Sequence, residues 1–157
     1  MYLNQDNYNN VVLNQHAMDT HRNTGQEPKS GIQILLAEDN VVNQVVATSF
    51  LEKFGYSVDL AEDGKIALSL SEKKSYDLIL MDIQMPEMDG LEVTKCIRSQ
   101  SKNPNKKSKI IAMTASVLKS EIEKCFIAGM DEYIEKPFDP NELENKLTNI
   151  FARQREH

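Results

Sequence analysis

Five side chains of the kinds that bind metals or phosphates in proteins stand at or just after the ends of short apolar segments. They are Glu38, Asp39, Asp82, Thr114 and Lys136. Carboxylates held together repel one another unless a cation neutralises them, and oxygen ligands without His or Cys select magnesium, manganese or calcium. Magnesium suits phosphoryl chemistry best, because it keeps bound waters and bridges to phosphate oxygens. These residue types therefore indicate a magnesium site that handles a phosphoryl group.

Asp82 is the candidate nucleophile of this set. A carboxylate can attack a phosphoryl group and form an acyl phosphate, provided that positive charge lies nearby. The metal and Lys136 would supply that charge, and the Thr114 hydroxyl would donate to a phosphoryl oxygen. Taken singly, each residue has a simpler structural role, such as Asp39 or Asn40 capping a helix. Capping does not explain a lysine and paired acids at successive segment ends, so the joint pattern favours chemistry.

The segments that must position these residues begin at Ile32. From there, short apolar runs alternate with amphipathic stretches of helical period, which is typical of β/α units around a parallel sheet. Strands are predicted over residues 32–37, 57–61, 76–81, 109–114 and 132–134. Right-handed crossovers then give an α/β fold with a doubly wound, five-stranded parallel sheet, in which ligands bind beyond the carboxyl ends of the strands. The candidate residues stand at those ends.

Helices are predicted between the strands from caps and apolar spacing. In the first, Val42, Val46 and Phe50 recur every four residues, between a candidate cap at Asn40 and a stop at Gly55. Two further helices are predicted around residues 65–74 and 91–100.

The last two predicted helices have recognisable ends. Ile122 and Phe126 share one face of the fourth helix, which Gly129 is expected to terminate. Asp139 is expected to cap the fifth helix, with Glu142 closing a capping box. The inward residues of this helix are predicted to be Leu143, Leu147 and Ile150.

Composition excludes several classes of protein. The chain has 157 residues, a net charge of −6 and a pI near 5.1, which argues against direct nucleic-acid binding, since phosphate backbones need basic surfaces. It has no apolar stretch of about 18 residues that predicts a membrane span. The start lacks the pattern of a signal peptide, so a cytoplasmic location is expected. We expect a flexible tail or linker over residues 1–31, a folded domain over 32–151 and a tail over 152–157.

Four motifs resemble the response-regulator receiver domain family, to which chemotaxis regulators belong. They are ILLAEDN at residues 34–40, MDIQMPEMDG at 81–90, IIAMTA at 110–115 and GMDEYIEKPF at 129–138. The resemblance covers about residues 32–151 and implies the strand order 2-1-3-4-5. It also implies two-component or phosphorelay signalling, in which phosphohistidine passes its phosphoryl group to an aspartate and the domain switches conformation.

The resemblance implies a metal and acceptor role for four residues. Asp82 would accept the phosphoryl group, and Asp39 would bind Mg²⁺ directly. Glu38 would be the acidic partner of Asp39, acting through water. Gln84 would offer its backbone carbonyl, so the implied metal set is Glu38, Asp39, Asp82 and Gln84.

The resemblance also implies how the phosphoryl group is held and sensed. Thr114 and Lys136 would bind it, beside the Asp82 acceptor. Thr114 and Tyr133 would form the switch, in which the tyrosine ring turns inward on activation. The peptide between Lys136 and Pro137 is typically cis in this family.

The first motif, with Asn43 and Gln44 after it, is similar to receivers at the carboxyl end of hybrid sensor histidine kinases. The implied partner is a histidine kinase domain or a histidine phosphotransfer protein, which docks beside Asp82 through the first helix. A stand-alone receiver would signal instead through the fourth and fifth helices. As an enzyme, the domain would catalyse only its own phosphorylation and slow dephosphorylation. It would be cytoplasmic, either as a separate protein or as the cytosolic part of a membrane-bound hybrid kinase.

Two other functions stay open from the sequence. The first is a pseudo-receiver scaffold, although such domains usually lose the acceptor or the acids that are intact here. The second is a magnesium-dependent phosphatase with an aspartyl nucleophile, which resembles Asp-x-Asp. Gln84 stands two residues after Asp82, so the site has no evident general acid. A scaffold is expected not to bind magnesium, whereas the receiver and the phosphatase both require it, so magnesium binding distinguishes them.

Overall fold

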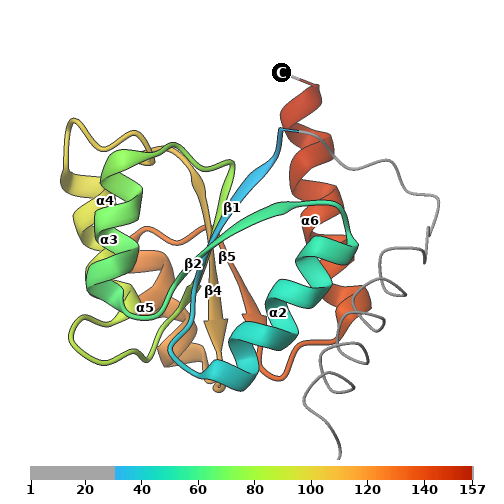
Figure 1. Cartoon of the computed structure of the whole chain (residues 1–157). Helices are drawn as coiled ribbons and strands as arrows, with labels where there is room; N and C mark the ends of the chain where they lie inside the picture. The colour runs from blue at the N-terminus through green and yellow to red at the C-terminus, as the bar shows by residue number, and fades with distance from the viewer. Residues whose placement is uncertain (1–30, 157) are drawn as a thin grey trace, which may run out of the picture.

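The computed structural model describes residues 31–156, in which strands and helices alternate through five β/α units (Figure 1). The strands are β1 Gln33–Ala37, β2 Ser57–Ala61, β3 Leu78–Asp82, β4 Lys109–Thr114 and β5 Glu132–Glu135. The helices are α2 Val41–Lys53, α3 Gly64–Lys73, α4 Gly90–Ser99, α5 Lys119–Ala128 and α6 Pro140–Arg155. None of these helices is long and apolar enough to cross a membrane. The tail predicted over residues 1–31 lies outside the described range except for its last residue, and residues 152–155 belong to α6.

All five strands pair in parallel in the order β2-β1-β3-β4-β5, which confirms the predicted doubly wound α/β fold. The order reverses between β1 and β3, the place where such sheets bind ligands. Ala37 lies opposite Met81 in the β1–β3 pairing. The residues that follow, Glu38 and Asp82, therefore emerge side by side at the carboxyl edge.

The sheet separates two hydrophobic layers (Figure 1). Helices α2 and α6 cover one face, with Leu51 and Leu147 in the core beneath them. Helices α3, α4 and α5 cover the other face, with Val93 in its core. In β1, Leu36 points into the first layer and Leu35 into the second. Because the central strands are buried on both faces, they are continuous apolar runs in the sequence.

β3 begins at Leu78, two residues later than the sequence predicts. Tyr76 is buried, but its backbone amide donates to the side-chain oxygen of Asn105 at 2.7 Å instead of joining the ladder. An apolar pattern reports burial and does not distinguish a strand residue from a buried neighbour. The other strand ends agree with the predicted ones to within one residue.

Helices α2 and α5 are confirmed, but no residue of their predicted apolar stripes is fully buried, and Phe50 is the one that packs, partly buried, against the first hydrophobic layer. Val42 is 69% exposed and Val46 40%, whereas Ala47 and Leu51 are buried. On α5, Phe126 is 46% exposed, and the buried residues are Cys125 and Ala128. Both helices carry apolar residues on more than one side, so spacing predicts a helix without fixing its orientation.

The predicted caps are mostly confirmed. Asn40 caps α2, and Gly129 ends α5 in the left-handed conformation that glycine adopts without strain. Asp139 caps α6 by accepting from two first-turn amides at 2.7 and 3.4 Å. In the part of the chain that the structure describes, the reciprocal bond of a capping box occurs at Asp89 and Glu92 of α4 and not at α6, so that prediction was wrong. The residues predicted to face inward, Leu143, Leu147 and Ile150, are buried.

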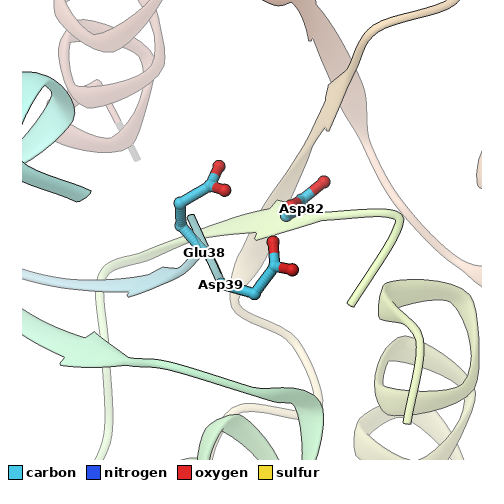
Figure 2. Close-up of side chains that lie close together, drawn as sticks. All are labelled: Glu38, Asp39 and Asp82. Carbon is cyan, nitrogen blue, oxygen red and sulfur yellow. The ribbon is translucent and has the colours of Figure 1, made fainter. Parts of the chain in front are cut away.

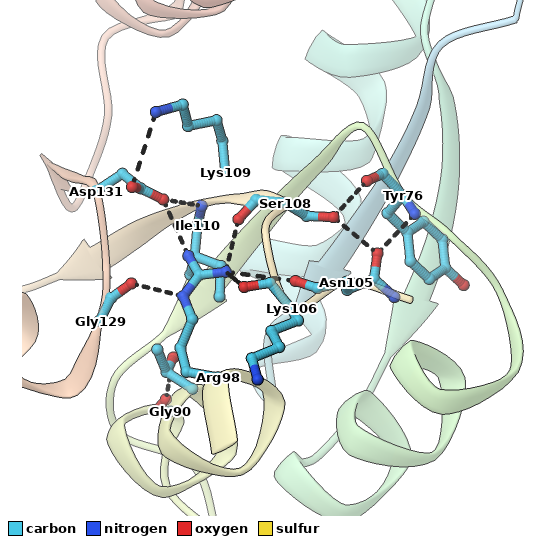
Figure 3. A network of polar contacts seen from close by, with 11 residues as sticks. Tyr76, Gly90, Arg98, Asn105, Lys106, Ser108, Lys109, Ile110, Gly129 and Asp131 are labelled. Carbon is cyan, nitrogen blue, oxygen red and sulfur yellow. Dashed lines mark hydrogen bonds and ion pairs between the residues drawn. The ribbon is translucent and has the colours of Figure 1, made fainter. Parts of the chain in front are cut away.

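At the amino end of the sheet, the loop before β4 is fixed by Asn105, which is fully buried (Figure 3). Its side-chain oxygen accepts from the Tyr76 amide at 2.7 Å and from the Ser108 hydroxyl at 3.0 Å. Its side-chain amide donates to the carbonyls of Ser71 at 2.6 Å and Lys74 at 2.7 Å. One side chain thus joins the end of α3, the approach to β3 and the loop before β4.

Arg98 of α4 makes a second connection at the same end (Figure 3). Its guanidinium donates to the carbonyl of Gly129 at 2.9 Å and to the carbonyls of Lys106 and Ser108 at 2.8 Å. It also pairs with the Asp131 carboxylate at 3.0 Å. The loops before β4 and β5 are therefore both attached to α4, away from the carboxyl edge.

Replacing Asn105 by alanine is expected to lower the free energy of unfolding by about 2 to 4 kcal/mol, because buried backbone groups lose their partners. Urea unfolding followed by circular dichroism measures this change. Asn149→Ala, at an exposed position of α6, is the matched control and should change the value by less than about 0.5 kcal/mol. Equal losses in the two variants would show that the Asn105 network does not stabilise the fold.

Candidate functional site

Three carboxylates lie together at the carboxyl ends of β1 and β3 (Figure 2). The side chains are those of Glu38, Asp39 and Asp82, and each offers an oxygen within 4.8 Å of the others. Glu38 and Asp82 are buried, with 1% and 3% of their surface exposed, whereas Asp39 is open to solvent. The three acids that the sequence places at strand ends are therefore brought together as predicted.

β4 and β5 bring Thr114 and Lys136 to the same edge. Met113 lies opposite Asp82 in the β3–β4 register, which places Thr114 one step beyond it. The Lys136 amide donates to the Thr114 carbonyl at 2.7 Å. The Lys136 Nζ lies 3.1 Å from a carboxylate oxygen of Asp82 and 3.1 Å from one of Glu38. All five candidate residues thus meet in one place.

The electrostatics of the site are set by burial and by the crowding of like charges. Burial raises the pKa of Asp82, the Glu38 carboxylate raises it further, and Lys136 opposes both, so the pKa lies at about 7. Burial by itself would lower the pKa of the Lys136 ammonium, but the two carboxylates outweigh it and raise that pKa. Lys136 therefore stays charged, and an added cation would favour the ionised form of Asp82.

Thr114 and Gln84 flank Asp82, but in this conformation both bond locally. The Thr114 hydroxyl donates to the Ser116 carbonyl at 2.8 Å and accepts from the Ser116 amide at 3.0 Å. The backbone amide of Gln84 donates to Asp82 Oδ1 at 3.2 Å. The contact of the Gln84 carbonyl with a metal stays a prediction.

These residues line a cleft of about 290 Å³ that also contains side chains to which the sequence analysis gave no role. Asn43, from the first turn of α2, has its amide nitrogen 3.4 Å from Glu38 Oε1. Ser116 lies on the β4–α5 loop, and Glu121 adds a further acid from α5. Asn43 stands three residues after the Asn40 cap, a spacing that places both on one side of the helix start and was the available signal.

Tyr133, in β5, is not among the residues that line the cleft. It is 37% exposed, and the Lys146 Nζ sits 5.9 Å from the centre of its ring. The ring is therefore not turned into the cleft in this conformation. The predicted inward turn, and with it the role of Tyr133 as a switch, stays a prediction. The Lys136–Pro137 peptide is cis, as the resemblance implies.

The donor set of the cleft fits a hard divalent cation. The cluster offers carboxylate oxygens and neither imidazole nor thiolate, which selects magnesium, manganese or calcium over zinc. The exposed Asp39 leaves one side of the cluster open to water, which suits a magnesium ion that keeps part of its hydration shell.

Comparison with known proteins agrees with this geometry. The family described as "Response regulator receiver domain" matches residues 34–148. "Histidine kinase 3" of Arabidopsis thaliana is 38% identical over 140 residues, which cover 77% of this chain and 14% of that protein. "Hybrid signal transduction histidine kinase I" of Dictyostelium discoideum is 44% identical over 116 residues, which cover 71% of this chain and 7% of that protein. The chain spans less than a fifth of the length of such curated relatives.

Solved structures show the same fold. The receiver domain of a sensor histidine kinase from Pseudomonas aeruginosa, with a magnesium ion coordinated in its active site cleft, is 41% identical with a TM-score of 0.72, covering 78% of this chain and 99% of that one. A further match comes from the co-crystal structure of a Saccharomyces cerevisiae histidine phosphotransfer protein and the receiver domain of its downstream response regulator. The matching chain is 33% identical with a TM-score of 0.70, and the match covers 78% of this chain and 90% of that one. The chain therefore belongs to the response regulator receiver domain family and is a receiver domain of phosphorelay signalling.

Proposed function

We propose that Asp82 accepts a phosphoryl group from phosphohistidine in a magnesium-dependent reaction. The observation that carries this proposal is the Lys136 ammonium, 3.1 Å from both buried carboxylates, Asp82 and Glu38. An incoming phosphoryl group adds negative charge at that place, where Lys136 is already fixed as positive charge. A preorganised charge of this kind needs no rearrangement when the reaction occurs.

The proposed magnesium site consists of Glu38, Asp39 and Asp82, with the backbone carbonyl of Gln84 as a further ligand. The ion, when bound, supplies positive charge that offsets the carboxylates and the phosphoryl oxygens. Support comes from the oxygen-only donor set and from the magnesium ion in the active site cleft of the Pseudomonas aeruginosa receiver.

In the proposed step, an oxygen of Asp82 attacks phosphorus. The new O–P bond forms as the N–P bond of phosphohistidine breaks, and its electron pair stays on the imidazole nitrogen. Lys136 exchanges a carboxylate partner for a phosphoryl oxygen. Thr114 exchanges the Ser116 carbonyl for another phosphoryl oxygen, and Tyr133 then turns inward, which is the proposed conformational switch.

The proposed partner is a histidine phosphotransfer protein or kinase domain that docks on α2, with this chain as part of a hybrid kinase on the cytosolic side. Four valines give α2 an apolar surface, with 68%, 69%, 61% and 40% of each side chain exposed: Val41, Val42, Val45 and Val46. The helix starts directly after Asn40 of the cleft lining, so a partner on this surface reaches Asp82. The hybrid kinase relatives and the co-crystal with a phosphotransfer protein support this assignment.

Incubation with magnesium and acetyl phosphate is expected to add the mass of one phosphoryl group to the parent protein and none to Asp82→Asn. Intact-mass spectrometry measures the adduct, and omission of magnesium should abolish it. Asp77→Asn, which changes an acid at the opposite end of β3, is the matched control and should be labelled like the parent.

Two outcomes would contradict the phospho-acceptor function. No adduct in any sample, with no magnesium binding, would indicate a scaffold. Rapid turnover of the donor without an accumulating adduct would indicate a phosphatase.

The raised pKa of Asp82 predicts a pH-dependent cost to stability. Because the native pKa exceeds that of the unfolded chain, the native state keeps a proton that the unfolded chain loses between about pH 4 and pH 7, and is progressively destabilised as pH rises through that window. Asp82→Asn removes this cost. Without magnesium, its gain in unfolding free energy over the parent should grow by about 1 to 3 kcal/mol from pH 5 to pH 8. Urea unfolding measures it; a pH-independent gain would contradict the assignment.

Docking through α2 predicts that the double variant Val42→Gln, Val45→Gln slows phosphotransfer from a phosphorylated histidine phosphotransfer protein about tenfold or more. Each change removes apolar contact worth roughly 1 kcal/mol or more without altering charge. Phosphorylation by acetyl phosphate should stay at the parental rate. Ile127→Gln, at an 83% exposed position of α5, is the matched control and should transfer normally. Impaired transfer in the control alone would place the docking surface on α5.

A further inference from the structure

The residue that links β1 to the acidic cluster is Glu38, and its backbone is held on both sides. Its amide donates to the Ala61 carbonyl at 3.0 Å, which ties it to the end of β2. Its carbonyl accepts from the side-chain amide of Gln44 at 2.8 Å. The path of the chain from β1 into α2, which also carries Asp39, is therefore set partly by one side chain of α2.

Gln44 is 8% exposed and occupies a position of α2 that faces the sheet, together with Ala47 and Leu51. Burying a side-chain amide costs free energy unless it is hydrogen bonded, so an apolar residue would serve packing better at this position. The bond to Glu38 offsets that cost. Helix packing alone does not account for a glutamine here, whereas holding the Glu38 carbonyl does.

Asn43, the neighbouring residue, acts on the carboxylate of Glu38. The Oε1 atom of Glu38 accepts from the Asn40 amide at 3.1 Å and lies 3.4 Å from the Asn43 side-chain nitrogen. The Oε2 atom pairs with Lys136 at 3.1 Å. The two oxygens are thus distinguished: one is engaged by the start of α2, and the other pairs with Lys136.

We infer that Gln44 and Asn43 are positioning residues for the magnesium site, acting through Glu38. Gln44 fixes the backbone that carries Glu38 and Asp39, and Asn43 fixes the rotation of the Glu38 carboxylate. Groups that hydrogen bond to metal-binding carboxylates commonly contribute tenfold to 100-fold to metal affinity. This inference rests on the proposed magnesium-dependent function and adds two residues that position Glu38 without touching the reacting atoms.

Gln44→Met keeps the size of the side chain and removes the amide, and it should weaken magnesium binding about tenfold. Asn43→Ala removes a longer hydrogen bond and should weaken binding roughly threefold. Isothermal titration calorimetry with magnesium chloride measures the dissociation constants directly. The magnesium concentration for half-maximal phosphorylation by acetyl phosphate should rise by the same factors, while the rate at saturating magnesium stays within about twofold of the parent.

That separation distinguishes positioning from a general structural role, which would lower the saturating rate and leave the affinity alone. Ser49→Ala, at an exposed position on the same helix, is the matched control and should bind magnesium like the parent. Circular dichroism without magnesium establishes whether each variant is folded. If Gln44→Met does not fold, Asn43→Ala decides the test. Parental affinity in the folded variants would overturn the inference. Failure of the parent itself to bind magnesium would instead overturn the proposed function.

Discussion

The rest of the structure depends on holding three carboxylates and one ammonium at a single edge of the sheet. Two of the acids, Glu38 and Asp82, are buried, and both share Lys136 at 3.1 Å. One ammonium cannot balance three carboxylates, and burial together with the Glu38 carboxylate raises the pKa of Asp82 to about 7. The fold therefore holds together a set of charges that repel one another. A bound cation, or a phosphoryl group with its counter-ion, would change the balance of charge at this site.

The stability that offsets this arrangement lies elsewhere in the molecule. Two apolar layers enclose β1 and β3, so their carboxyl ends cannot move apart without disturbing the core. At the amino end of the sheet, Asn105 and Arg98 fix the loops through several hydrogen bonds each. The strands are thus anchored at the amino end of the sheet, opposite the acidic cluster. The loops at the carboxyl end are left available to rearrange.

The sequence predicts the meeting of the five candidate residues because parallel strands end at one edge, and apolar runs show where strands end. It does not predict how α2 faces the sheet, since Val42 and Ala47 are both apolar and only packing decides between them. It also gives no role to Asn43 and Glu121, whose places in the cleft depend on how the first turns of α2 and α5 lie against the strand ends. Tyr133 is found by its motif, but the sequence does not predict that its ring is partly exposed in this conformation.

The exposed valines of α2 are not explained by the isolated domain. β-Branched residues are poorer helix formers than alanine or leucine, and those with most of their surface in water, Val41, Val42 and Val45, gain little from burial. They alternate along two turns with Asn43 and Gln44, which bond to Glu38. A partner that covers the valines therefore touches the same helix that orients the acidic cluster. If docking shifts that helix, partner affinity and magnesium affinity must change each other by the same factor, because such coupling is reciprocal.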